Sequence, residues 1–322
     1  MTAGAIEFSE VEPGLGFGSR VWGATRENLA EEAVRARIMA EFEDRGLLIF
    51  EQVEQTPEMQ LAVSAVIGEL KDHPVAAVPR AGEDLAPGII DLTTEPGDDQ
   101  NVVEFGGRRL SNWLPWHFDH TYNNELNRAG VLRPVTIAPD GGQTGFADGI
   151  ALYEWLDPEL RQRIEGMRVI YTLDLRRQNF GRPPGMREVA VGKSTHAVSD
   201  MARDRPRSLH PAVWTRRSGE KVLHVSTLHS VGLEGREDEA GNALFEAVCQ
   251  AVNRYPHAYF HSWKPNQMLT WDNWRMLHCV TGTDPGNVRR MHRTTIKGDY
   301  GLGCFEGEDA PLAASQTSRP TP

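Results

Sequence analysis

The motif Trp116-His117-Phe118-Asp119 holds the residues of this chain that are best suited to bind a metal ion. Residues two positions apart on a β-strand point to the same face, so the imidazole of His117 and the carboxylate of Asp119 can contact one ion together. With a second imidazole they form the two-histidine, one-carboxylate set that holds non-haem Fe(II) and leaves coordination positions open. The chain contains 11 histidines, and the H-x-D motif alone does not choose the third ligand among them.

A second group of polar residues lies toward the C-terminus. His278 follows an apolar segment, and Arg289 comes later, inside the run 288–296. If this run is a strand, Arg289 and Arg293 lie on one face. Two arginines that faced the interior would need anionic partners, and a carboxylate bound through two hydrogen bonds suits a guanidinium best. Periodicity does not decide which face is inward, and an outward face would leave both arginines solvated.

These residues, in this order, resemble the TauD/TfdA (taurine dioxygenase-like) family of Fe(II)- and 2-oxoglutarate-dependent dioxygenases. Three further segments are similar to family motifs: Gly141-Gly142-Gln143-Thr144, Trp271-Asp272-Asn273 ahead of His278, and the run 291–296. The resemblance covers about residues 10–300. It implies an oxidoreductase that oxidises a small substrate with O2, by hydroxylation or a related oxidation, while 2-oxoglutarate becomes succinate and CO2.

The resemblance also implies roles for individual residues. His117, Asp119 and His278 would hold Fe(II). Thr144 and Arg289 would bind the distal carboxylate of 2-oxoglutarate, whose keto acid end chelates the iron.

The substrate itself is not named by the resemblance. Arg293 matches a position that meets the anionic group of the substrate in the taurine enzyme, and Asn112 would contact substrate or co-substrate. We therefore expect a small anionic substrate. The aromatic residues near the H-x-D motif, such as Trp113 and Trp116, would suit a ring-bearing molecule as well. His224 and His229 are further candidates for the substrate pocket, with core packing as the alternative.

The middle of the chain is basic, although the whole chain has a formal net charge of −11. Lys and Arg outnumber Asp and Glu in residues 161–217. Within this segment, residues 176–187 combine four arginines with glycines and prolines, a composition that suits a mobile lid. We hypothesise that this loop closes over the iron and attracts an anionic substrate. The alternative is a solvated basic loop.

The elements that must position these residues are mainly short strands. Apolar runs separated by turn signals predict strands at 47–50, 130–137, 167–175, 212–214, 221–226, 258–263, 267–271 and 288–296. Helical periodicity predicts helices at 25–45, from Thr56-Pro57 onward, at 152–165 and at 242–255. Many strands with few helices predict a mainly β fold with flanking helices, a double-stranded β-helix (jelly roll, cupin-like). We expect a single domain over 1–305 and a disordered tail over 306–322.

Composition excludes several classes of protein. The chain has 322 residues, of which 39% are hydrophobic and 25% charged, as in globular proteins. Its acidic balance disfavours nucleic-acid binding, and no apolar stretch is long enough to cross a membrane. Three cysteines without a C-x-x-C pair suit a reducing cytoplasm. A homo-oligomer is compatible with these features.

Two other functions fit part of the pattern. A catalytically silent cupin-like protein could bind a metal or a small anion with the same residues. A hydrolase could hold zinc with His117, Asp119 and His278, but it would leave Arg289 and Thr144 without a role.

Overall fold

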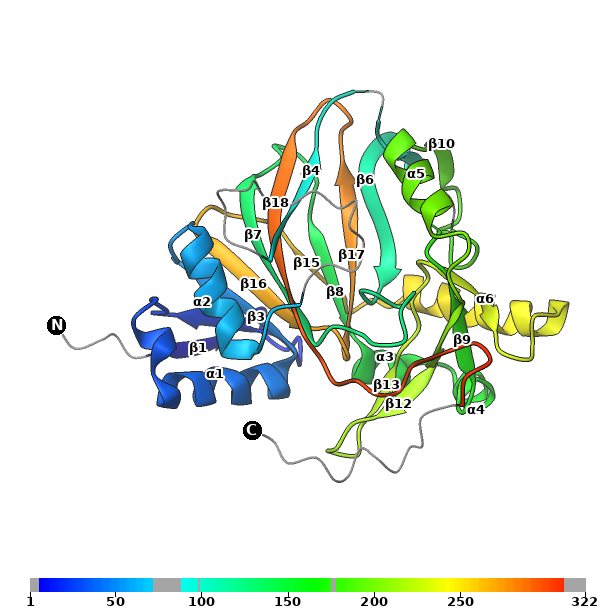
Figure 1. Ribbon diagram of the computed structural model, residues 1–322, viewed down its shortest axis with the longest axis horizontal. Helices are drawn as coiled ribbons and strands as arrows, with labels where there is room; N and C mark the ends of the chain where they lie inside the picture. The colour runs from blue at the N-terminus through cyan, green and yellow to red at the C-terminus, as the bar shows by residue number, and fades with distance from the viewer. Residues whose placement is uncertain (1–5, 72–87, 98, 175–177, 310–322) are drawn as a thin grey trace.

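Two large β-sheets face each other in the computed structural model, which describes residues 6–71, 88–97, 99–174 and 178–309 (Figure 1). In spatial order, the first sheet contains β1 (Glu7–Glu10), β2 (Ser19–Trp22), β3 (Leu47–Glu51), β16 (Gln267–Asp272), β7 (Ala129–Thr136), β18 (Arg289–Ile296) and β4 (Ile89–Thr94). The second contains β10 (Arg187–Ala190), β5 (Val102–Phe105), β6 (Arg108–His117), β17 (Met276–Thr283), β8 (Thr144–Asp148) and β15 (Tyr259–His261). The paired strands are antiparallel except β2 and β3.

Smaller elements surround these sheets. A further sheet contains β14 (Ser230–Leu233), β9 (Arg168–Tyr171), β11 (Ser208–Pro211) and β19 (Cys304–Phe305), and β12 (Val213–Thr215) pairs with β13 (Lys221–Leu223). The helices are α1 (Glu32–Arg45), α2 (Pro57–Ile67), α3 (Gly149–Trp155), α4 (Pro158–Ile164), α5 (Lys193–Met201) and α6 (Glu239–Asn253), with a 3-10 turn at Asn28–Ala30.

The apolar core is divided into layers. Between the two large sheets lie side chains from both, among them Leu132, Phe146 and Trp271. Helices α1 and α2 cover the outer face of the first sheet (Figure 1), and α6 covers the outer face of the second. This arrangement is the double-stranded β-helix with flanking helices that the sequence predicts.

Several elements begin or end where the sequence predicts. Strands β3, β7, β16 and β18 lie within one residue of their predicted bounds. Helix α2 begins at Pro57 because Thr56 Oγ1 accepts the Met59 N–H at 3.2 Å. Strands β9, β13 and β15 are shorter than predicted, and α6 begins and ends before its predicted bounds.

Two helices differ from the prediction. Helix α1 begins at Glu32 rather than at Thr25, because the backbone is extended at Glu31 (φ −76°, ψ 127°) and separates α1 from the preceding 3-10 turn. The predicted helix 152–165 is split into α3 and α4. Proline at position 158 cannot donate a backbone hydrogen bond, and Asp157 caps a new helix there by accepting the Glu159 N–H at 2.9 Å.

Three elements near the site were not predicted. They are α5, β8 and β17. Helix α5 contains several Ser, Thr and Val residues, which are poor helix formers. Strands β8 and β17 contain glycines, which interrupt a strand pattern in the sequence.

Two hydrogen bonds involve the residues that follow β19 at Cys304–Phe305. Arg207 Nε donates to Glu306 Oε2 at 2.7 Å, and the Phe305 N–H donates to Glu308 at 2.9 Å. Residues 306–309 are exposed, and the disordered tail over 306–322 stays a prediction. Residues 310–322 lie outside the described part of the chain.

The state of the cysteines and the length of the helices bear on the expected reducing environment and on the expected absence of a membrane span. Cys249, Cys279 and Cys304 are buried free thiols. Among the described residues, none of the helices has the length and apolar character that a membrane span requires.

Candidate metal centre

His117, Asp119 and His278 come together between the sheets. One ligand atom from each lies within 4.8 Å of the others, and all three residues are buried. The Nε2 atom of His117 is 3.9 Å from Asp119 Oδ1, and the Nε2 atom of His278 is 3.5 Å from Asp119 Oδ2. Two imidazoles and a carboxylate at these distances form a donor set that fits a single Fe(II) ion.

Strand pairing brings the two histidines together. His278 on β17 is the register partner of His117 on β6. The motif predicted a strand through Asp119, but β6 ends at His117 and Asp119 lies in the turn that follows. The carboxylate therefore reaches the histidines through the geometry of this turn rather than through strand alternation.

The ligand atoms are in protonation states that suit metal binding. Burial and the neighbouring His278 lower the pKa of His117 to about 3, so its ring is neutral near pH 7. Its Nδ1 lies 2.8 Å from the Pro115 carbonyl and so carries the proton, which leaves Nε2 as a lone-pair donor. Burial by itself raises the pKa of the Asp119 carboxyl, but Arg293 and His278 hold that pKa well below its ordinary value.

Arg293 is the partner of Asp119. Its Nη1 and Nη2 atoms donate to the two carboxylate oxygens at 3.0 and 2.5 Å. The guanidinium also lies over the ring of Trp271, 5.5 Å from its centroid. Inward arginines were expected to need anionic partners, and for Arg293 the structure supplies the Asp119 carboxylate.

Arg289 is a buried cation without an acidic partner among the described residues. It is 5% exposed, and its Nε donates to the Gly142 carbonyl at 3.2 Å. Burial lowers the pKa of Arg289 to about 10, so it stays charged near pH 7. Met291 lies in the core between the two sheets and Arg293 pairs with Asp119 there, so the face that Arg289, Met291, Arg293 and Thr295 were predicted to share is inward.

Thr144 approaches the same region through the glycine segment before it. Its buried Oγ1 accepts the Trp263 Nε1–H at 3.1 Å, and Gly142, two residues earlier, contacts Arg289. Gly141 has φ +73°, and a Cβ there would lie 2.5 Å from the Gly282 carbonyl oxygen. Only glycine allows this close approach of β17.

The neighbours of the centre were only partly predicted. The ring of Tyr122, three residues after Asp119, meets His229 edge-on at 5.2 Å, and Tyr122 packs with Leu173 and Ala202. Burial raises the pKa of Tyr122, and the negative charge of Asp119 adds to that effect. His229 is thus the one of the two candidate histidines that lies beside the centre.

Other candidates lie elsewhere. His224 is fully buried and stacks on Phe118, with ring centroids 3.9 Å apart. Trp113 and Trp116 do not face the histidines, because they line a cavity of about 530 Å³ beside Cys279 on the outer side of the second sheet. The suggestion that they form a substrate platform is therefore wrong.

Asn112 and the predicted lid at 176–187 are the remaining candidates for substrate contact. Asn112 is half-buried on β6 with φ +54°, a left-handed conformation that is uncommon outside glycine. In the proposed lid, Gly181 donates to Glu246, while Asn253 and Gln250 donate to the carbonyls of residues 181 and 182, so this part is anchored to α6. Arg176 and Arg177 lie outside the described residues.

A buried two-histidine, one-carboxylate cluster inside a double-stranded β-helix defines a mononuclear metal enzyme with coordination positions left for reactants. Residues 10–295 match the family model "Taurine catabolism dioxygenase TauD, TfdA family", and the chain belongs to that family. It is accordingly an oxidoreductase of the 2-oxoglutarate-dependent dioxygenase class, which uses Fe(II), 2-oxoglutarate and O2.

Individual relatives and solved structures are similar over most of the chain. The (S)-phenoxypropionate/alpha-ketoglutarate-dioxygenase of Sphingobium herbicidovorans is 27% identical over 285 residues, 88% of this chain and 92% of the relative. Pentalenolactone F synthase of Streptomyces arenae is 26% identical over 216 residues, 65% of this chain and 71% of the relative. A taurine dioxygenase structure from Burkholderia xenovorans superposes with a TM-score of 0.67 at 21% identity, covering 95% of this chain and 94% of that chain.

Proposed function

We propose that His117, Asp119 and His278 hold Fe(II), that Arg289 and Thr144 bind the distal carboxylate of 2-oxoglutarate, and that the enzyme oxidises a small organic anion. Arg289 is the observation that carries this proposal. A buried guanidinium with no acidic partner among the described residues is costly unless an anion arrives to pair with it. A dicarboxylate bound at the metal supplies such a partner.

Each residue has a distinct task in this scheme. Bound Fe(II) supplies the activation of O2 that couples substrate oxidation to the conversion of 2-oxoglutarate into succinate and CO2. The neutral ring of His117 would offer the lone pair of Nε2 to the metal. Its orientation is fixed by the hydrogen bond from Nδ1 to the Pro115 carbonyl. Arg293 offsets the charge of Asp119 and orients its carboxylate. The apolar packing around the buried cluster excludes bulk water from the reacting groups.

We propose an aromatic carboxylate, of the aryloxyalkanoate type, as the substrate class. The relative from Sphingobium herbicidovorans is named for phenoxypropionate. In this chain, Tyr122, His229 and Leu173 form an aromatic and apolar wall beside Asp119. The resemblance suggests Arg293 for contact with a substrate anion, and Asn112 stays a weaker candidate for the same contact.

Substrate-stimulated formation of succinate tests the proposal. Purified protein with Fe(II), ascorbate, O2 and 2-oxoglutarate is assayed against a panel of aryloxyalkanoates, alkanesulfonates and uncharged aryl ethers. We expect stimulation by the aryl carboxylates and none in the Asp119→Ala variant. Succinate formation in that variant equal to wild type would remove Asp119 from the centre. No succinate with any substrate would favour a silent binding protein.

Several expectations stay predictions. These are the cytoplasmic location, the absence of nucleic-acid and membrane partners, the single domain over 1–305 and the homo-oligomer. The lid hypothesis also stays a prediction for Arg176 and Arg177, which lie outside the described residues.

A further inference from the structure

The backbone of Asp119 has an unusual partner. Because β6 ends at His117, Asp119 lies beyond the pairing with β17. Its N–H donates instead to Asn273 Oδ1 at 2.9 Å, and its carbonyl accepts from Asn273 Nδ2 at 3.2 Å. A side-chain amide thus contacts both polar groups of one residue, as a neighbouring strand would.

We propose that Asn273 is a positioning residue that fixes Asp119 in the conformation required for metal binding. This inference rests on the proposed metal site. With both its N–H and its carbonyl held, the peptide groups on each side of the Asp119 Cα cannot rotate freely. The direction of the carboxylate toward the two histidines is then set before a metal arrives. The resemblance covered Asn273 but gave it no role.

Asn273 is itself held firmly. It is fully buried, its Nδ2 also lies 3.2 Å from the carbonyl and from the side-chain oxygen of Asn127, and its N–H donates to the Arg128 carbonyl at 3.0 Å. The amide orientation follows from these contacts, since Nδ2 faces acceptors only and Oδ1 faces the Asp119 N–H.

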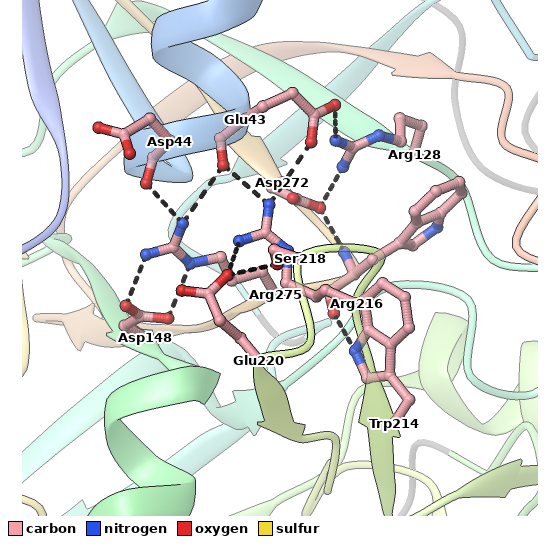
Figure 2. A network of polar contacts seen from close by, with 11 residues as sticks. Glu43, Asp44, Arg128, Asp148, Trp214, Arg216, Ser218, Glu220, Asp272 and Arg275 are labelled. Atoms are coloured by element: carbon pink, nitrogen blue, oxygen red, sulfur yellow. Dashed lines mark hydrogen bonds and ion pairs between the residues drawn. The ribbon is translucent and has the colours of Figure 1, made fainter. Parts of the chain in front are cut away.

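The turn that carries Asn273 is fixed by a network of charged residues (Figure 2). Asp272 accepts from the Trp274 N–H at 2.9 Å and is paired with Arg128, which also reaches Glu43 at 2.6 Å. On the other side of the turn, Arg275 donates two hydrogen bonds to Asp148 at 2.9 and 2.8 Å (Figure 2).

One connection between the two sheets therefore serves two ligands. The turn between β16 and β17 carries Asn273, which holds Asp119, and β17 carries His278 directly. A shift of this connection between β16 and β17 would move both ligands together. The charged network around the turn restrains it against such a shift.

Metal affinity without turnover tests the inference. Co(II) is titrated into metal-free protein, and its visible absorption bands give the dissociation constant, while thermal unfolding of the metal-free protein reports stability. We expect Asn273→Ala to raise the Co(II) dissociation constant by about tenfold or more. Gln60→Ala is the matched control, because Gln60 is an equally buried amide whose Nε2 donates to the Val131 and His292 carbonyls and to none of the three ligands.

The control separates positioning from stability. If both variants lower the melting temperature but only Asn273→Ala weakens Co(II) binding, the inference holds. An affinity in Asn273→Ala within about twofold of the Gln60→Ala value would overturn it. If Asn273→Ala does not fold, Asn273→Asp decides, because it keeps the acceptor for the Asp119 N–H but offers no donor to the Asp119 carbonyl. We expect its affinity to fall severalfold, and an unchanged value would again overturn the inference.

Failure of the metal site has a different signature. If wild type binds no Co(II), or if Asp119→Ala binds as wild type does, the proposed site and this inference fall together. If Asp119→Ala loses binding while the Asn273 variants keep it, only the role of Asn273 is removed.

Discussion

Arg289 favours the binding of 2-oxoglutarate, but its unpaired charge lowers the stability of the protein without ligand. The guanidinium is buried beside Gly142 without an acidic partner in the described structure. We expect Arg289→Met to raise the KM for 2-oxoglutarate about 30-fold or more, since the lost charge pair is worth about 2 kcal/mol at least. The same change should increase the free energy of unfolding of the metal-free protein by about 1–3 kcal/mol, because it removes an unpaired buried charge.

Steady-state kinetics and urea denaturation measure the two effects. Arg289→Lys serves as the comparison and should recover only part of the affinity, because an ammonium cannot make two parallel hydrogen bonds. A KM for 2-oxoglutarate equal to wild type in Arg289→Met would move the role to another residue.

Arg293 and Asp119 form a pair whose members depend on each other. Both are buried, with two hydrogen bonds between them. In protein stripped of metal, Asp119→Ala should lower the free energy of unfolding by about 3–5 kcal/mol, because it leaves Arg293 buried and unpaired. Arg293→Met added to that variant should restore part of the loss.

A double-mutant cycle by urea denaturation measures this coupling. We expect an interaction free energy of about 1–3 kcal/mol. Additive effects of the two substitutions would show that the pair contributes nothing to the folded state.

At the scale of elements, the turn between β16 and β17 is stabilised by contacts to α1 and α3. Asp148 both caps α3, by accepting the Ile150 N–H at 3.0 Å, and binds Arg275 (Figure 2). We expect Arg275→Gln to lower the free energy of unfolding by about 3–5 kcal/mol, because Asp148 stays buried without its cation. Chemical denaturation measures the loss.

An exposed ion pair provides the control for this prediction. Arg236 lies 3.9 Å from Asp238 at the surface, where a pair is worth about 0–1 kcal/mol. Arg236→Gln should therefore change little. Equal losses in the two variants would mean that burial of the Arg275 pair does not matter.

At the scale of the whole molecule, buried histidines make the folded state sensitive to acid. Burial lowers the pKa of His210 to about 4 and that of His261 to about 4, and it lowers the pKa of His224 well below its ordinary value. In the unfolded chain these rings take up protons near their ordinary pKa of 6.5, whereas in the folded protein they do not. Stability is therefore complete above pH 6.5 and falls as the pH drops toward 4.

His224 allows a direct test of this effect. Among the described residues neither of its ring nitrogens has a hydrogen-bond partner, and the ring stacks on Phe118 and Tyr300. We expect His224→Phe to reduce the pH dependence of the free energy of unfolding by up to about 1.4 kcal/mol per pH unit in this range. Urea denaturation at several pH values measures the slope, and a slope equal to wild type would contradict the assignment. The exposed His257 gives the control variant, His257→Gln.

The layered packing explains which parts of the fold could be predicted. Strands β3, β7, β16 and β18 lie in the centre of a sheet that is covered on both faces, so their apolar runs are continuous. Such runs are visible without tertiary information. Strands β8 and β17 contain glycine where another strand or side chain approaches closely, at Gly145 beside Cys279 and at Gly282 beside Ser111, so their pattern is broken.

The sequence by itself determined the donor set. His117 and Asp119 indicate a metal site by their types and spacing, and the resemblance of the ordered motifs to a known family adds His278, Thr144 and Arg289 and so predicts the chemistry. Side-chain chemistry is local, and it is present in the chain before folding. The inward direction of Arg289 and Arg293 could not be predicted, since alternation places residues on a common face without stating which face is buried.

Only the tertiary structure decided how these groups are held. Asp119 leaves its strand and is fixed by Asn273, a residue from a distant turn, and Arg293 pairs with that same carboxylate. The wall beside the centre comes from Tyr122 and Leu173, while Trp113 and Trp116 face the opposite side of the sheet. These outcomes depend on strand register and on where β6 ends. Both are set by packing between segments that lie far apart in the chain, and no local pattern of residues encodes them.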